Sequence, residues 1–562
     1  MPRVRLRLLT ALIAIAFSLV AISHFAEAQH SAVNTYAITN ARIVPVSGPV
    51  IERGAVVIRN GLIAAVGANV SAPPDARIVD GAGLTVYPGL IDCYTSLGLP
   101  EATPSPSPGG GLFQAVARLP ASTQGGAPNS TQPVGLQPEV MVDDLIKPGG
   151  ADIESERNVG ITTALTVPRT GIWMGQSAVI DLAGDTPQQM IVRSPVAMHV
   201  GFTPLRGTYP GSLMGVFASL RQMLLDAQRY RDSVQIYERT PRGMRRPDPD
   251  KSLAALIPVL EGRMPVVMYA DREREIERAL DLAEEFKLRI MIAGGRESAR
   301  LADRLVKQNV PVLLSLNLPR RMTAALPEAD PEPLRLLRER VEAQQTAGKL
   351  AQAHVRFGFQ SGSLANISDL LVNAGRTVEN GLAHDDAVRA FTIWPAEILG
   401  VANQLGTIEI GKIANLTIMR GDLLDRNSRL VHVFIDGRPI DLKPATTPGQ
   451  PQGNASGTWS LSVHLDPGGD ITLILRLQQE GDRLRGSIQG FLGTGEISNA
   501  SVASAEVRFT ASVNVEGQTK EATFAGTISG NEMHGTVTIE GRAPGSFTAT
   551  RSATQPMPSP GR

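Results

Sequence analysis

The sequence predicts an α/β protein with three parts: a closed β/α barrel, a small β unit made from segments on both sides of that barrel, and a C-terminal all-β domain. Three patterns support this. Apolar strands alternate with helical periodicity through the middle of the chain, Gly-centred strand pairs flank that region, and short strands without helices fill the C-terminal part. The 562-residue length suits roughly three to four domains.

Charge and cysteine content exclude several classes of protein. The 54 Lys and Arg residues balance 54 Asp and Glu residues, without long runs of like charge, so the sequence gives no sign of nucleic-acid binding. The single cysteine, Cys93, excludes an intramolecular disulfide framework and a zinc site built on several thiolates.

Residues 1–28 are typical of a signal peptide. Three arginines precede an apolar run from Leu8 to about Ile22, and Ala26-Glu27-Ala28 has the small-x-small spacing of a cleavage site. The run is short for a spanning helix of about 20 residues. We therefore expect an exported protein, periplasmic or secreted from a bacterium, with no membrane association after cleavage. An uncleaved N-terminal anchor is the alternative.

The first β unit is expected over residues 34–86, where apolar and polar residues alternate between Gly-centred turns, and its partner strands over 404–442. Residues 87–403 are expected to form the barrel. One of its helices follows Ala270 and can be capped by Asp271. Its buried face is predicted to contain Ile276, Ala279, Leu280, Ala283 and Phe286.

Two segments interrupt the barrel pattern. Residues 99–136 are rich in Pro, Gly and Ser, which predicts a long mobile insertion over the mouth where barrel proteins bind ligands. Residues 239–251 form a basic, Pro-containing segment, interpreted as a solvated loop between helices.

The C-terminal part begins after a linker at 443–456 that is rich in Pro, Gly and Thr. Residues 457–550 contain about seven short strand patterns, which predict an antiparallel up-and-down barrel or a sandwich. Residues 551–562 are expected to be a tail.

Several segments together resemble the amidohydrolase superfamily, particularly its imidazolonepropionase-like members. They are YAITNARIVPVSG, VIRNGLIAAVG and VDGAGLTVYPGLIDCYTSLG near the start, and AVRAFTIWPAEILGV, LGTIEIGKIANLTIMRGD and VFIDGRP before residue 443. The resemblance implies a TIM-like barrel with a composite β-sandwich from both chain ends. It also implies metal-dependent hydrolysis of C–N bonds other than peptide bonds.

The positions that match the superfamily's metal ligands carry other residues. PGLIDxHxHxG stands here as PGLIDCYTSLG, with Tyr94 and Ser96 in place of the histidines, and PVVMYADRE has Tyr269 in the next ligand position. IMIAGGRE has Gly294, and FGFQSGS has Gln360 in place of the acid, or Gly362 under a shifted alignment. The resemblance therefore predicts no metal and no other cofactor, although relatives use zinc or another divalent ion.

An offset alignment does not recover the lost ligands. Of eight histidines, only His199, His354 and His384 fall within the barrel. His199 is expected in the core or a loop, His354 at the end of the eighth strand away from the mouth, and His384 on the surface. Cys93 could act as a nucleophile, but no histidine is expected beside it, so we interpret it as a small buried hydrophobe. Asp92 and Asp271 could form an acid/base pair, although the first belongs to a structural motif and the second is a predicted cap.

The sequence thus favours a catalytically impaired, exported protein that binds a small molecule or peptide at the barrel mouth. Tyr94, Ser96, Tyr269 and Gln360 are expected to converge on one neutral, hydrogen-bonding pocket with Gly294 on its wall. Two alternatives remain. One is an active C–N hydrolase with a non-standard metal site or a metal-free route, and the other is an envelope interaction module acting through the C-terminal domain.

Overall fold

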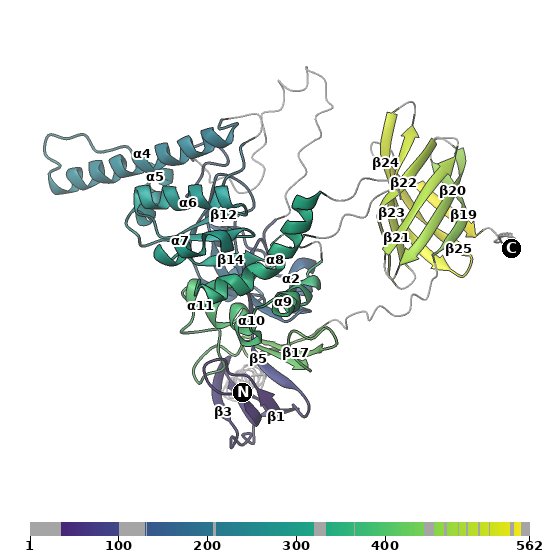
Figure 1. Ribbon diagram of the computed structural model, residues 1–562, viewed down its shortest axis with the longest axis horizontal. Coiled ribbons are helices and arrows are strands. Elements are labelled where there is room, and N and C mark those ends of the chain that lie inside the picture. Colours follow the sequence, from purple (N-terminus) through teal and green to yellow (C-terminus); the bar gives the residue numbers. More distant parts are fainter. Residues whose placement is uncertain are drawn as a thin grey trace, which may run out of the picture. The chain divides into compact units, whose positions relative to one another are not determined.

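The computed structural model describes residues 35–100, 130, 132–205, 209–319, 333–362, 364, 366–442, 455–465, 469–480, 483–490, 493–503, 506–515, 518–539 and 545–551. They form two compact units that divide between Leu442 and Lys443 (Figure 1). The predicted signal peptide, residues 101–129 of the predicted insertion, most of the predicted linker and residues 552–562 lie outside the described residues.

Strands from both ends of the first unit share one eight-stranded sheet, in the order β18-β17-β16-β5-β1-β2-β3 with β4 beside β1. Two hairpins in this sheet turn at Asn60-Gly61 and Asp436-Gly437, where all four residues have positive φ, as a tight hairpin turn requires. All eight strands are hydrogen-bonded in one sheet, whereas the sequence predicted a sandwich. The strands are β1 (Thr35–Ile43), β2 (Ile51–Arg59), β3 (Leu62–Gly67), β4 (Arg77–Asp80), β5 (Thr85–Pro88), β16 (Leu416–Arg420), β17 (Arg429–Ile435) and β18 (Arg438–Ile440).

Two further sheets form the centre of the first unit. One has the order β10-β9-β7-β6, and the other has the order β15-β14-β13-β12-β11-β8, in which β11 to β15 are parallel. The strands are β6 (Leu90–Thr95), β7 (Ile161–Thr166), β8 (Trp173–Gln176), β9 (Ala178–Asp181), β10 (Ile191–Arg193), β11 (Met198–Gly201), β12 (Val266–Ala270), β13 (Ile290–Gly294), β14 (Val312–Ser315) and β15 (Phe357–Gln360).

The two central sheets adjoin at both edges. The Ser177 N–H, between β8 and β9, donates to the Ala197 carbonyl at 3.0 Å, and the Asp92 carboxylate on β6 accepts from the Ser361 N–H after β15 at 3.1 Å. β8 and β9 run antiparallel to their neighbours β11 and β7. The expected run of parallel strands is therefore interrupted at this position.

Helices follow most of the central strands (Figure 1). The predicted apolar face of α6 is buried. Its N-cap is Arg272 rather than Asp271, because the Glu275 carboxylate accepts from the N–H groups of both residues at the start of the helix. The helices are α2 (Ala151–Arg157), α3 (Pro187–Met190), α4 (Leu213–Arg239), α5 (Lys251–Leu260), α6 (Glu273–Phe286), α7 (Ala302–Lys307), α8 (Leu334–Gln352), α9 (Asp369–Glu379), α10 (His384–Phe391) and α11 (Ile393–Ile398), with short 3-10 turns η1 (Val142–Asp144) and η2 (Ser298–Leu301).

The described end of the predicted insertion is packed. Leu136 is buried and forms a parallel β-bridge with Trp173, which is also buried. The sequence predicted a mobile insertion that ends at residue 136. The packed Leu136 shows that any mobile part ends before this residue. The basic segment 239–251 connects α4 to α5, as a loop between helices was predicted to do. In the described parts of the chain, no helix has the length and apolar character needed to cross a membrane.

The second unit is a closed antiparallel barrel in which each strand pairs with the next and β26 pairs with β19. Of the two predicted alternatives, the strand pairing shows the up-and-down barrel. Trp459, Phe509, Phe524 and Phe547 are buried in its core. The strands are β19 (Gly457–Leu465), β20 (Gly469–Glu480), β21 (Arg483–Gly490), β22 (Gly493–Ala503), β23 (Glu506–Val515), β24 (Gln518–Ser529), β25 (Glu532–Ile539) and β26 (Gly545–Arg551).

Candidate functional site

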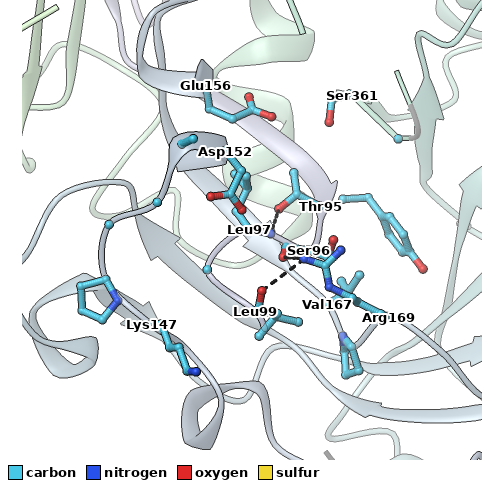
Figure 2. Close-up of a pocket in the computed structure, with 18 of the residues that line it drawn as sticks. Thr95, Ser96, Leu97, Leu99, Lys147, Asp152, Glu156, Val167, Arg169 and Ser361 are labelled. Atoms are coloured by element: carbon cyan, nitrogen blue, oxygen red, sulfur yellow. Dashed lines mark hydrogen bonds between the residues drawn. The ribbon is translucent and has the colours of Figure 1, made fainter. Parts of the chain in front are cut away.

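A cavity of about 960 Å³ opens at the carboxyl ends of β6, β7 and β15 (Figure 2). The residues after these strands supply much of its wall, and α2 with the loop before it supplies the remainder of one side. Tyr269, near the end of β12, also lines it. This is the edge of a parallel sheet at which barrel proteins gather ligand contacts. Its volume lies within the range typical of small-molecule sites.

Three of the sequence-predicted residues line this cavity: Tyr94, Ser96 and Tyr269. The rings of Tyr94 and Tyr269 lie 5.9 Å apart between centroids, although the two residues come from different sheets. Burial raises the pKa of the Tyr94 phenol well above its usual value. Burial, with the nearby Asp271 carboxylate, raises the pKa of Tyr269 to about 12. Both phenols are therefore neutral at physiological pH.

Gln360 and Gly294 are not among the residues that line the cavity, which corrects the expected five-residue arrangement. The Gln360 side chain is fully buried and its Nε2 donates to the Leu313 carbonyl of β14 at 2.8 Å. Gly294 has φ +91°, and a Cβ there would come within 2.7 Å of the Asp271 carboxylate. Gly362, the position given by the shifted alignment, does line the cavity.

The three barrel histidines do not come together. His199 on β11 is fully buried, neither ring nitrogen has a partner among the described residues, and burial lowers its pKa to about 3. Its ring lies 5.7 Å from that of Tyr94, so it lies behind the cavity wall. His354 lies in the turn before β15, and His384 begins α10 with its Nε2 2.8 Å from the Asp422 carboxylate.

Charged groups also line the cavity, which corrects the expectation of a neutral pocket. Lys147, Asp152, Glu156 and Arg169 all contribute to its wall. The Arg169 guanidinium donates to two backbone carbonyls, those of Ser96 and Leu99, at 3.2 Å each. Sequence analysis missed these four residues because none of them lies at a position aligned with the superfamily's metal ligands, and two of them come from α2.

The burial of Glu156 could have been predicted from the sequence. It lies one helical turn after the buried Ile153 in α2, and residues three apart share a helix face, so a carboxyl group on the buried face was foreseeable. Glu156 is only 6% exposed. Burial first, and the nearby Asp92 and Asp152 carboxylates second, raise its pKa well above the usual value.

Asp92 and Asp271 do not act as a pair. Asp92 is buried and accepts the N–H groups of Tyr94 and Ser361, each at 3.1 Å, and burial raises its pKa to about 6. Asp271 instead accepts from the Tyr269 hydroxyl at 3.4 Å and lies 3.6 Å from Arg296. Asp92 therefore holds the end of β6 to the segment after β15.

Cys93 is expected to resist alkylation in the folded protein. Its thiol is fully buried, a Cβ on Gly358 would come within 2.5 Å of the sulfur, and burial followed by the Asp92 carboxylate raises the pKa of this thiol well above its usual value. Mass spectrometry after iodoacetamide treatment at pH 8 should find this cysteine unmodified in folded protein and modified in urea. Equal labelling under both conditions would contradict the buried placement.

The residues present do not fit a catalytic metal ion. In the described part of the chain, no three His, Cys, Asp or Glu side chains form a group that could hold one. At the cavity, the groups in the aligned ligand positions are two neutral phenols and a hydroxyl, whereas zinc and similar ions are held by imidazole, thiolate and carboxylate.

The chain is similar in part to one protein family and to several solved structures. The model of the Amidohydrolase family matches residues 335–440. A solved amidohydrolase from Thermotoga maritima MSB8 superposes with a TM-score of 0.60 at 24% identity, covering 73% of this chain and 100% of that chain. A Xaa-Pro dipeptidase with bound methionine in the active site gives a TM-score of 0.44 at 16% identity, covering 72% and 100%. The Thermotoga likeness implies a TIM-like barrel with a β-rich domain.

Proposed function

We propose that this chain, whose predicted resemblance to the amidohydrolase superfamily is confirmed by the family match, is an exported binding protein that has lost the superfamily's metal centre. It binds a small molecule or peptide in the cavity at the carboxyl ends of the central strands, without hydrolysing it. The observation that carries this proposal is the set of neutral side chains, Tyr94, Ser96 and Tyr269, lining the cavity in place of metal ligands.

The chemistry of these groups supports binding over hydrolysis. A metal-bound water reaches a pKa of about 7, which gives hydrolases a strong nucleophile at neutral pH. Two neutral phenols and a serine hydroxyl provide hydrogen bonds but no comparable activation of water. A cavity of about 960 Å³ is nevertheless large enough to enclose a small ligand.

Metal content tests this proposal. Protein purified without chelator is expected to hold less than about 0.2 equivalents of zinc, manganese, nickel or iron, because the aligned positions lack the usual ligands. Elemental analysis after dialysis measures this directly. The double variant Tyr94→His with Ser96→His is also expected not to bind zinc tightly, since two histidines leave the site short of the usual three or four protein ligands.

Two results would contradict the proposal. Near-stoichiometric metal that survives dialysis would show an intact centre built from other residues. Tight zinc binding by the double variant would show that further ligands are already in place around the cavity.

A second candidate is a metal-free C–N hydrolase, and Glu156 is the observation that favours it. This carboxyl group lines the cavity, and burial raises its pKa well above the usual value, as in general acids. Hydrolysis of an amide panel by metal-free protein, abolished in Glu156→Gln, would establish this function in place of the first.

A further inference from the structure

We propose that the ligand of this cavity carries an organic ammonium group and that Glu156 is the counter-ion for it. The inference rests on the proposed function, because it names the ligand class of the same cavity. It begins from one buried side-chain oxygen that lacks a hydrogen-bond partner. Glu156 is only 6% exposed, and it lines the cavity. Its Oε2 has no hydrogen-bond partner among the described residues.

A buried carboxyl oxygen without a partner is costly, and most such groups in native proteins are satisfied by protein, water or ligand. Here the group lies at the wall of a cavity that a ligand can enter. Figure 2 shows the Glu156 carboxyl group on the side of the cavity where Ser361 lies, well separated from Lys147. A positively charged donor on the ligand can therefore pair with the Glu156 carboxyl group.

Two other carboxyl groups mark this end of the cavity as acidic. Asp152 lines the same wall, and Asp92 lies behind it, close enough that both carboxylates act on Glu156. Within the described part of the chain, none of these three side chains forms an ion pair with Lys, Arg or His. Asp92 and Asp152 instead accept backbone N–H groups. Asp152 is exposed and solvated, so a cation supplied by a ligand would pair with the buried Glu156 rather than with Asp152.

An organic cation fits this arrangement better than a metal ion. Metal ions need several ligand atoms within about 2.0–2.6 Å, and no suitable group of three side chains exists in the described residues. An ammonium group on a carbon skeleton is larger and is satisfied by one carboxylate together with aromatic faces. Tyr94 and Tyr269 bring two rings to the same cavity.

Two cationic residues, Lys147 and Arg169, also line the cavity and would favour an anionic ligand. Arg169 already donates to the carbonyls of Ser96 and Leu99, and its side chain is exposed rather than buried. Lys147 lies apart from Glu156 in Figure 2. Both side chains are exposed, so water solvates their charges, whereas Glu156 is buried and its Oε2 has no hydrogen-bond partner among the described residues.

Binding should be linked to a proton. Burial and the neighbouring carboxylates raise the pKa of Glu156, which favours its protonated form in the empty cavity. To pair with an ammonium group it must ionise, so its proton passes to the buffer while the ligand N–H donates to the carboxylate. An ammonium ligand is therefore expected to release a proton from Glu156 when it binds.

Calorimetric titration of the full-length protein with three matched probes tests the inference. The probes are 2-phenylethylammonium, neutral 2-phenylethanol and anionic 3-phenylpropionate. The ammonium compound is expected to bind at least about tenfold more tightly than the other two. Its binding heat should also depend on the ionisation enthalpy of the buffer, as proton release requires.

Glu156→Gln keeps the shape of the side chain and is expected to remove the ammonium preference. Glu154→Gln is the matched control, because it makes the same Glu-to-Gln change in the same helix at a residue that does not line the cavity. If Glu156→Gln does not fold, Asp152→Asn provides a second variant, expected to weaken ammonium binding about twofold to threefold.

Tighter binding of 3-phenylpropionate, equal binding of all three probes, binding of none of them, or an unchanged preference in Glu156→Gln would each overturn the inference. These results are separate from failure of the proposed function, which would appear as bound metal or amide turnover. If the protein is metal-free and inactive but prefers the anionic probe, the proposed binding function stands and the ammonium inference is wrong.

Discussion

A chain that ends at Leu442 is expected to unfold in one cooperative transition, whereas a chain that ends at Gly400 is expected not to fold. The shorter chain loses β16, β17 and β18, and β16 is the antiparallel partner of β5. It also loses buried side chains that β16 and β17 contribute to the cores of the first unit. They include Leu416, Ile418, Phe434 and Ile435.

The magnitude decides the outcome. Burying one such side chain stabilises a protein by roughly 1.5–3 kcal/mol, so losing four of them costs on the order of 10 kcal/mol. This is comparable with the whole stability of a typical domain, about 5–15 kcal/mol. The chain that ends at Leu442 keeps all of these contacts, since β19 to β26 have a core of their own.

Urea unfolding followed by circular dichroism measures both chains. The longer one should give a single sigmoidal transition and the shorter one a gradual change without a folded baseline. The same sigmoidal transition in both chains would show that β16, β17 and β18 do not stabilise the first unit.

The accuracy of the sequence-based prediction followed the strength of the local pattern. Strands with apolar periodicity and Gly turns, such as Tyr36 to Ile43, were predicted, as was the helix that contains Ile276 and Phe286. β22, with the sequence GTGEISNASVA, was missed because Gly, Ser and Asn have low β propensity, and its place in the sheet comes from pairing with β21 and β23. The antiparallel β8 and β9 were missed because strand direction depends on long-range pairing.

The site was likewise predicted where local sequence motifs determine it and missed where long-range packing does. Strand ends in motifs placed Tyr94, Ser96 and Tyr269 at the cavity, but side-chain direction depends on packing that the sequence does not show. Gln360 turns to the Leu313 carbonyl instead. Glu156 reaches the cavity from a helix outside any family motif, so an alignment to known ligand positions could not identify it.

A buried polar network joins the central sheets to the eight-stranded sheet, and Asp181 is its titrating member. Asn415, just before β16, donates from Nδ2 to the Asp181 carboxylate at 2.7 Å, and the Thr163 hydroxyl of β7 donates to the same oxygen at 2.8 Å. Burial raises the pKa of Asp181 from 3.8 to about 7, and the Asp436 carboxylate adds to this, while the two hydrogen bonds oppose it.

The direction of the pH effect follows from this raised pKa. Between about pH 4 and pH 7 the folded protein keeps a proton on Asp181 that the unfolded chain has lost. This group's contribution to the free energy of unfolding is therefore fully present below about pH 4 and is lost as the pH rises through about 7. From pH 5 to pH 8 the loss is roughly 2–3 kcal/mol, at about 1.4 kcal/mol for each pH unit below the folded pKa.

Asp181→Asn isolates this contribution, because an amide oxygen can accept both hydrogen bonds yet never ionises. Relative to wild type, the variant is expected to gain roughly 2–3 kcal/mol of unfolding free energy between pH 5 and pH 8. Asp92 and Glu156 also have raised pKa values through burial, but they titrate in both proteins and cancel in the comparison. Urea titrations at the two pH values measure the difference, with the exposed Asp185→Asn as the control that should show none. A stability difference between Asp181→Asn and wild type that is the same at pH 5 and pH 8 would contradict this prediction, because it would mean that Asp181 is already ionised in the folded protein at pH 5.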